Sequence, residues 1–176
     1  MDKIKVAILF GGCSEEYYVS IKSAMEIAAN IDTEKYHPVF VGITKSGSWK
    51  ICERPCLEWE QHAKYPVVFS PGRNTNGLMI QRGGGYEIQP IDVVFPIIHG
   101  KFGEDGSIQG LLELSGVPYV GCDTQSSVIC MDKSLAYTTV KEAGIEVPDF
   151  QIVTDGSSLR AEILKFPLFV KPARSG

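Results

Sequence analysis

The chain has 176 residues and a mass of 19.3 kDa, which suffices for one complete domain and part of a second. Hydrophobic residues make up 44% and charged residues 22%, values that exclude a disordered or fibrous chain. Seventeen basic against 21 acidic side chains give a net charge of −4 without any run of lysine or arginine. A nucleic-acid partner is therefore excluded, and small molecules are the expected partners.

The longest apolar stretch, residues 93–98, is far shorter than the ~20 residues that cross a bilayer, and the first residues lack the pattern of a signal peptide. The five cysteines are odd in number, which favours reduced thiols over a disulfide framework. Cys52 and Cys56 alone lack the second pair of ligands of a structural zinc site. We expect a cytoplasmic protein with no membrane segment.

The first half of the sequence opens like an α/β protein. Residues 4–10 form an apolar run typical of a strand buried on both faces, and Gly11-Gly12 ends it. Helical spacing predicts a helix over residues 19–30 with Ser20 as its cap, and residues 39–43 alternate as a second strand. Strand, glycine turn and helix in this order predict a parallel sheet.

A less regular segment follows. Residues 49–51 extend the chain, and residues 52–65 show no clear periodicity. Three short extended pieces, residues 67–69, 78–80 and 86–88, are separated by glycine-rich turns and predict an antiparallel excursion with hairpins. We expect this excursion to lie at the periphery.

A second strand–loop–helix unit begins at residue 91. Residues 91–98 restore the buried-strand pattern, the loop 99–106 follows, and Ile108, Leu111 and Leu112 lie on one side of a predicted helix. Residues 117–120 are predicted to form a short strand.

The last third changes character. Asp132 is predicted to cap a helix that extends to residue 143, where Gly144 and the later Pro148 stop it. Beyond it, an extended piece at 150–153, a short helix at 161–164 and a strand at 168–171 predict the start of a separate α+β unit.

Acidic residues follow both buried strands at the edge where parallel sheets bind ligands. The first loop, residues 11–16, lacks the dinucleotide fingerprint and places Glu15 and Glu16 where a phosphate would approach the helix. The second loop adds His99, Glu104 and Asp105. Carboxylates beside an imidazole suit an ammonium group, which leads to the hypothesis of an amino-acid substrate.

Structural explanations for these residues remain open. The acids of the first loop could complement the dipole of the following helix, and those of the second loop could form a turn capped at Ser107. His99 could be a histidine at the edge of the core. Lys133, Lys171 and Arg174 could face a phosphate or extend into solvent.

Four segments carry a resemblance to a known family: GGCSEEYYVS at 11–20, HGKFGEDGSIQG at 99–110, GCDTQSSVICMDKS at 121–134 and FVKPARSG at 169–176. They resemble the D-alanine:D-alanine ligase family of ATP-grasp enzymes. Within it, the similarity is to the vancomycin-resistance D-alanine:D-lactate ligases, through AILFGGCSEE at 7–16, KSAMEIAANIDTEKY at 22–36, GITKSGSWKICERPCLEWE at 42–60 and SSVICMDKSLAY at 126–137. The likeness covers the whole chain and implies an α/β domain with a parallel sheet over residues 1–125. Residues 126–176 would be the truncated start of the α+β ATP-grasp domain, so the chain would be about half of a ligase.

The resemblance also assigns roles to residues of the two loops. It makes Glu16 the carboxylate that holds the ammonium of the first D-alanine, with His99 and Glu104 supporting that pocket. Lys22 matches a lysine near the second-substrate pocket. Tyr17-Tyr18 depart from the His and small polar or acidic residue common in resistance ligases, and this difference bears on pocket shape and second-substrate choice.

The nucleotide site would be incomplete in this chain. Lys133 and Lys171 match two lysines that reach ATP phosphates, and Arg174 is grouped with them. The family's Mg²⁺ ligands lie in the other half of the ligase, so none is assigned here. We therefore expect these 176 residues alone to be inactive.

The implied reaction is the ATP-dependent formation of a D-alanine-terminated peptidoglycan precursor, in which D-lactate attacks the acyl phosphate of D-alanine. Glycopeptide resistance would be its consequence. A D-alanine or D-serine ligase, or a non-catalytic amino-acid-binding module, remains an alternative, and a homodimer is left open. A Rossmann dehydrogenase is disfavoured because the fingerprint glycines are absent.

Overall fold

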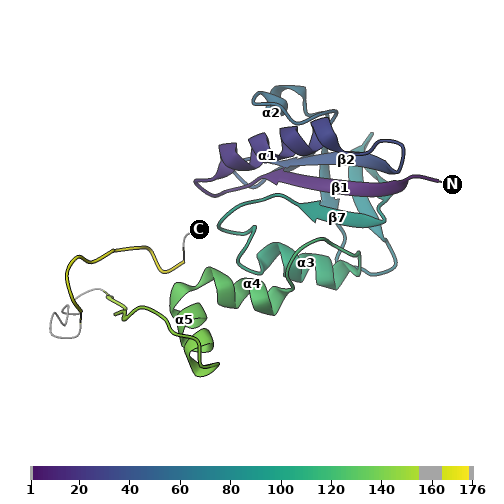
Figure 1. The fold of residues 1–176 in the computed structure, drawn as a ribbon. Helices are drawn as coiled ribbons and strands as arrows, with labels where there is room; N and C mark the ends of the chain where they lie inside the picture. Colours follow the sequence, from purple (N-terminus) through teal and green to yellow (C-terminus); the bar gives the residue numbers. More distant parts are fainter. Residues whose placement is uncertain (1, 155–163, 175–176) are drawn as a thin grey trace.

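The computed structural model describes residues 2–154 and 164–174 (Figure 1). Its strands form one seven-stranded sheet in the order β6-β5-β4-β3-β2-β1-β7. The strands are β1 (Ile4–Gly11), β2 (Tyr36–Ile43), β3 (Trp49–Cys52), β4 (Tyr65–Phe69), β5 (Gly77–Arg82), β6 (Gly85–Pro90) and β7 (Val93–Pro96). The helices are α1 (Tyr17–Asn30), α2 (Trp59–His62), α3 (Ser107–Ser115), α4 (Thr124–Met131) and α5 (Lys133–Glu142).

The parallel part of the sheet is centred on β1, as predicted. β1 pairs in parallel with both β2 and β7. Alternate residues of this strand enter two apolar clusters: Ile8 packs with α1 through Ile21, whereas Leu9 packs with α3 through Leu112. Helices therefore cover both faces of β1, which explains why its sequence is apolar throughout.

Helix α1 begins at Tyr17, two residues earlier than predicted, and Ser20 does not cap it. The side chain of Ser20 is fully buried one turn inside the helix and hydrogen-bonds two loops of the sheet. Spacing alone predicts that a serine near the start of a helix is its cap. Only the two hydrogen-bond partners, which are distant in sequence, show that Ser20 has a different role.

The antiparallel excursion is confirmed, with β3, β4, β5 and β6 pairing in sequence toward one edge of the sheet. The structure adds the single-turn helix α2, which periodicity did not predict. Its Trp59 is fully buried and forms an edge-on contact with Phe10, the ring centroids being 5.3 Å apart. The segment before β4 is thus tied into the core.

The second strand–loop–helix unit, β7 to α3, is confirmed. The strand expected at 117–120 is reduced to one parallel bridge between Val94 and Tyr119. The predicted cap at Asp132 is confirmed, because its carboxylate accepts hydrogen bonds from the N–H groups of Ser134 and Leu135 at the start of α5. Helix α4, capped by Asp123, was not predicted.

The prediction of a strand at 168–171 is wrong, because these residues show no regular structure, and the extended piece at 150–153 forms no strand either. No described strand lies beside either segment, and an isolated strand has no partner for its backbone groups. The side chains of Phe169 and Val170 are 90% and 97% exposed. The predicted helix at 161–164 falls, except for its last residue, outside the described residues. No helix in the described part of the chain is long and apolar enough to span a membrane.

Candidate functional site

The loops after β1 and β7 are joined by two serines. Ser20 Oγ accepts a hydrogen bond from Gly11 N–H at 2.8 Å and donates to the carbonyl oxygen of Ile97. Ser14 Oγ donates to the carbonyl oxygen of His99 at 2.7 Å. The acidic first loop and the histidine-containing second loop are therefore held side by side at the carboxyl edge of the sheet.

Glu16 lies at this junction. Its backbone N–H donates to Ser14 Oγ at 3.2 Å, and its half-buried side chain lies against Gly100. A Cβ added to Gly100 would come within 2.7 Å of Glu16 Oε2. Gly100 also has a φ of +69°, so both its conformation and the nearby carboxylate require a residue without a side chain.

The second loop brings two more predicted site residues next to Glu16. His99 Nδ1 lies 3.7 Å from Glu104 Oε1, and His99 Nε2 lies 3.4 Å from Ser23 Oγ on α1. Glu104 Oε2 accepts a hydrogen bond from Gly100 N–H at 2.7 Å. Residues 99–104 thus place the imidazole and the Glu104 carboxylate together, and Glu16 meets the same segment at Gly100.

Asp105, the other acid of the second loop, shapes the turn. It accepts hydrogen bonds from Phe102 N–H at 2.9 Å and Ser107 N–H at 3.1 Å. Although partial burial alone would raise its pKa, these hydrogen bonds hold the pKa of Asp105 below its ordinary value. The turn interpretation therefore applies to Asp105, whereas Glu104 bonds back toward Gly100.

A hollow of about 580 Å³ opens beside this cluster, between the loop after β7 and helix α4. Three of the predicted site residues line it: His99, Glu104 and, from the start of α5, Lys133. Its remaining polar lining comes largely from α4 and the turn before it, including Cys122, Ser126 and Cys130. The lining therefore includes one basic residue, Lys133, and one acidic residue, Glu104.

The other predicted cations do not line this hollow. Lys22 is exposed on α1, and Lys171 is exposed on the C-terminal segment. Arg174 Nε donates to Asp132 Oδ2 at 2.8 Å, and Lys133 N–H donates to the carbonyl of Ala173 at 2.9 Å, so residues 173–174 contact the start of α5. Hydrogen bonds from Ser134 and then from Arg174 hold the pKa of Asp132 well below its ordinary value.

Within residues 2–154 and 164–174, no three His, Cys, Asp or Glu side chains gather in a way that could hold a metal ion. The carboxylate of Glu104 is instead engaged with the Gly100 N–H group and with His99.

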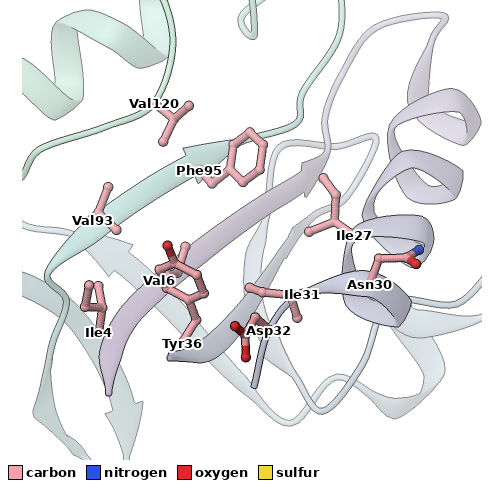
Figure 2. A pocket seen from close by; sticks show the side chains of 10 residues that line it. All are labelled: Ile4, Val6, Ile27, Asn30, Ile31, Asp32, Tyr36, Val93, Phe95 and Val120. Atoms are coloured by element: carbon pink, nitrogen blue, oxygen red, sulfur yellow. The ribbon is translucent and has the colours of Figure 1, made fainter. Parts of the chain in front are cut away.

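A second hollow, of about 640 Å³, has a different character (Figure 2). It is lined chiefly by aliphatic and aromatic side chains of α1, β1 and β7, among them Ile27, Val6 and Phe95. Its one carboxylate, Asp32, pairs with Lys35 at 3.0 Å. With no convergent set of polar groups, this hollow offers nothing to orient a small polar substrate.

Sequence reasoning missed the residues that support the site from behind. Tyr17 OH donates to Glu60 Oε1 at 2.5 Å and accepts from the indole N–H of Trp59 at 3.0 Å. The ammonium of Lys45 lies 5.3 Å from the centre of the Tyr17 ring and 4.7 Å from that of Tyr18. Residues 52–65 carried no periodic signal, so only an isolated tryptophan in a polar segment could have pointed to them.

The whole chain is similar to known proteins. Residues 5–122 match the protein family described as D-ala D-ala ligase N-terminus. VanB, the vancomycin B-type resistance protein of Enterococcus faecalis, is 62% identical over all 176 residues, which correspond to 51% of its length. A Streptomyces coelicolor protein named as a D-alanine–D-lactate ligase is 56% identical over the same 176 residues, again 51% of its length.

The fold is shared with solved ligases. The crystal structure of the VanG D-Ala:D-Ser ligase from Enterococcus faecalis aligns with a TM-score of 0.76 and 42% identity, covering 84% of this chain and 44% of that one. This chain thus spans about half the length of the curated relatives it matches, and its mixed α/β sheet corresponds to their N-terminal region. Taken with the junction of Glu16, His99 and Glu104, these matches show that the chain belongs to the D-alanine–D-alanine ligase family and is homologous to the N-terminal half of vancomycin-resistance ligases.

Proposed function

We propose that this chain is the N-terminal part of an ATP-dependent ligase that joins D-alanine to D-lactate, and that Glu16 holds the first D-alanine. The observation that carries the proposal is the junction of the two loops at the carboxyl edge of the sheet, where Glu104 contacts His99 and Gly100 while Glu16 lies against Gly100. In α/β sheets this edge is where ligands bind.

The proposed roles follow from charge and position. The half-buried Glu16 carboxylate would pair with the substrate ammonium, and Gly100 leaves the space in which that carboxylate lies. Glu104 would fix the imidazole of His99 while its other oxygen fixes the backbone at Gly100. A substrate ammonium held in this way would have its carboxylate directed away from the two acids, toward any cation in the adjoining hollow.

Lys133 is the cation in that hollow, and it supports the ATP assignment. When bound, ATP would supply the phosphoryl group that turns the D-alanine carboxylate into a reactive acyl phosphate. Lys133 would neutralise charge on its phosphates. Lys171 and Arg174 are proposed for the same role, although here they lie outside the hollow. The described residues hold no group of three ligands for Mg²⁺. Residues 1–125 would form the α/β domain of this ligase, and residues 126–176 the start of its ATP-grasp domain.

D-Lactate is proposed as the second substrate because a relative that is 56% identical is named for D-lactate and because Lys22 offers an electrostatic reason. D-Lactate is an anion at neutral pH, whereas D-alanine carries an ammonium that must lose a proton before it can attack. A cation near the second-substrate pocket would disfavour the ammonium form. Lys22 is exposed on α1, next to the Ser23 that contacts His99.

The experiment uses the full-length protein with ATP, D-alanine and D-lactate, and separates the ester from the amide product by mass spectrometry. We expect mostly ester near pH 6, with the amide share rising toward pH 9, and more amide at pH 6 for Lys22→Met. A ratio that is flat between pH 6 and 9 would contradict the role of Lys22. Amide alone at every pH would indicate a D-alanine–D-alanine ligase, and D-alanine binding without any product would indicate a non-catalytic binding module.

A further inference from the structure

Tyr17, the residue directly after Glu16, is tied to a distant part of the chain. It is the first residue of α1 and is buried. Its hydroxyl donates to Glu60 at 2.5 Å and accepts from Trp59 at 3.0 Å, and both partners come from α2, more than 40 residues later. The hydroxyl therefore has both a donor and an acceptor partner, and the ring has a fixed orientation.

Those partners are themselves anchored to the strands that carry the site. Trp59 is fully buried, packs edge-on against Phe10 of β1, and lies on the backbone of β2. A Cβ added to Gly42 would come within 2.4 Å of the indole ring, so the glycine is what allows this close approach. The hydroxyl of Tyr17 is thus hydrogen-bonded to a group that cannot shift without disturbing the core.

The contact continues from Tyr17 into the binding loop. Its ring packs against Gly11, where an added Cβ would lie 3.2 Å from Tyr17 Cε2. Its backbone N–H donates to the carbonyl of Ser14 at 3.3 Å. The hydroxyl of that same Ser14 bonds both Glu16 N–H and the His99 carbonyl. Glu16 therefore lies between two residues, Ser14 and Tyr17, whose side chains are both held by hydrogen bonds.

The Tyr17 phenol is protonated, and a lysine contacts its ring. Burial first, and then the hydrogen bond to Glu60, raise the pKa of Tyr17 above its ordinary value, so the phenol keeps its proton at neutral pH. The ammonium of Lys45 also lies over the rings of Tyr17 and Tyr18, which is a favourable cation–π contact.

We propose that Tyr17, anchored by Trp59 and Glu60, is a positioning residue that fixes the Glu16 carboxylate against Gly100. It touches no reacting atom. The proposal rests on the proposed function for its substrate readout, whereas its structural readout can be measured on this chain alone.

The first test measures amide hydrogen exchange in the 176-residue chain carrying Tyr17→Phe. The ring remains, so the change removes only the two hydrogen bonds of the hydroxyl. Tyr119→Phe is the matched control, because it removes a hydrogen bond of the same kind, to Glu113 at 3.0 Å, outside this loop. We expect protection of the Glu16 amide to fall about three- to tenfold relative to amides of β2, as one or two lost hydrogen bonds predict. Equal protection at Glu16 in Tyr17→Phe and Tyr119→Phe would overturn the proposal, as would a uniform loss over the whole chain.

The second test measures kinetics in the full-length protein. Tyr17→Phe should raise KM for the first D-alanine about three- to tenfold while kcat and KM for ATP change less than about twofold. Glu60→Gln keeps an acceptor for the phenol and should stay within about threefold of wild type. A fall in kcat at unchanged KM would overturn the positioning role. If the wild-type protein forms no D-alanine product, the proposed function fails and the exchange experiment alone decides the role of Tyr17.

Discussion

Replacing Ser20 by alanine should destabilise the domain by about 2 kcal/mol. Ser20 is fully buried, and its hydroxyl bonds both Gly11 N–H and the Ile97 carbonyl. A buried N–H left without a partner costs ~1–3 kcal/mol, and the carbonyl loses its donor as well. The better helix propensity of alanine returns ~0.5 kcal/mol, which leaves the net cost near ~2 kcal/mol.

The assay is urea unfolding followed by circular dichroism, with Ser23→Ala as the control. Ser23 lies on the same helix, so alanine gains the same propensity there, but its hydroxyl makes only a 3.4 Å contact with His99. With a slope of ~2 kcal/mol per molar urea, Ser20→Ala should lower the midpoint by ~1 M. Equal midpoints for the two variants would refute the account of Ser20 as the link between the two loops.

Three other outcomes follow from the same structure. Burial, and to a lesser degree the neighbouring Cys56 thiol, raises the pKa of Cys52 to about 12. Maleimide should therefore label the exposed Cys13 within minutes at pH 7 and the buried Cys52 only after unfolding. Labelling of both thiols at the same rate would contradict this prediction. The lowered pKa of Asp132 stabilises the fold above pH ~4, and this contribution is lost as pH falls through the lower folded pKa. The melting temperature of Asp132→Asn should therefore lie below that of wild type at pH 7 and approach it toward pH 2. A difference in melting temperature that stays the same from pH 7 to pH 2 would contradict this role of Asp132. Gly100→Ala should lower the free energy of unfolding in urea by ~1–2 kcal/mol because of the left-handed backbone alone. In the full-length protein it should also raise KM for D-alanine, because the added Cβ displaces Glu16. An unchanged free energy and an unchanged KM would show that the loop adapts.

The central strands and their helices were predictable because each signal is local. The apolar run of β1 is interpretable without its neighbours, since burial on both faces demands it. Asp132 has the short acidic side chain of a helix cap, and its bonds to the start of α5 confirm the prediction.

The features that sequence reasoning missed depend on distant partners. The position of Ser20 in the sequence suggests a helix cap, but its hydroxyl is hydrogen-bonded to Gly11 and Ile97. Trp59 lies in a segment with no period, and its role comes from Gly42 and Tyr17. The strand predicted at 168–171 has the right residues for a sheet but no described strand to pair with.

The candidate site was predictable in part. The order of strands and loops placed Glu16, His99 and Glu104 at one edge, and the structure brings them within contact distance of one another or of Gly100. Spacing could not show that Lys133 lines the same hollow while Lys22 lies on the outer surface of α1. Lys133 lies at the start of α5, directly after α4, and the sequence did not predict α4.

The most direct test of the central claim compares Glu16→Gln with Glu15→Gln in the full-length protein. Both changes remove one negative charge from the same loop, but only Glu16 lies against Gly100, while Glu15 is exposed. Losing one partner of a desolvated charge pair costs ~2–5 kcal/mol, so KM for the first D-alanine should rise at least ~30-fold in Glu16→Gln, with KM for ATP little changed. Glu15→Gln should stay within about twofold of wild type. A larger defect in Glu15→Gln, or equal KM values for D-alanine in the two variants, would contradict the assignment of Glu16 as the residue that holds the substrate ammonium.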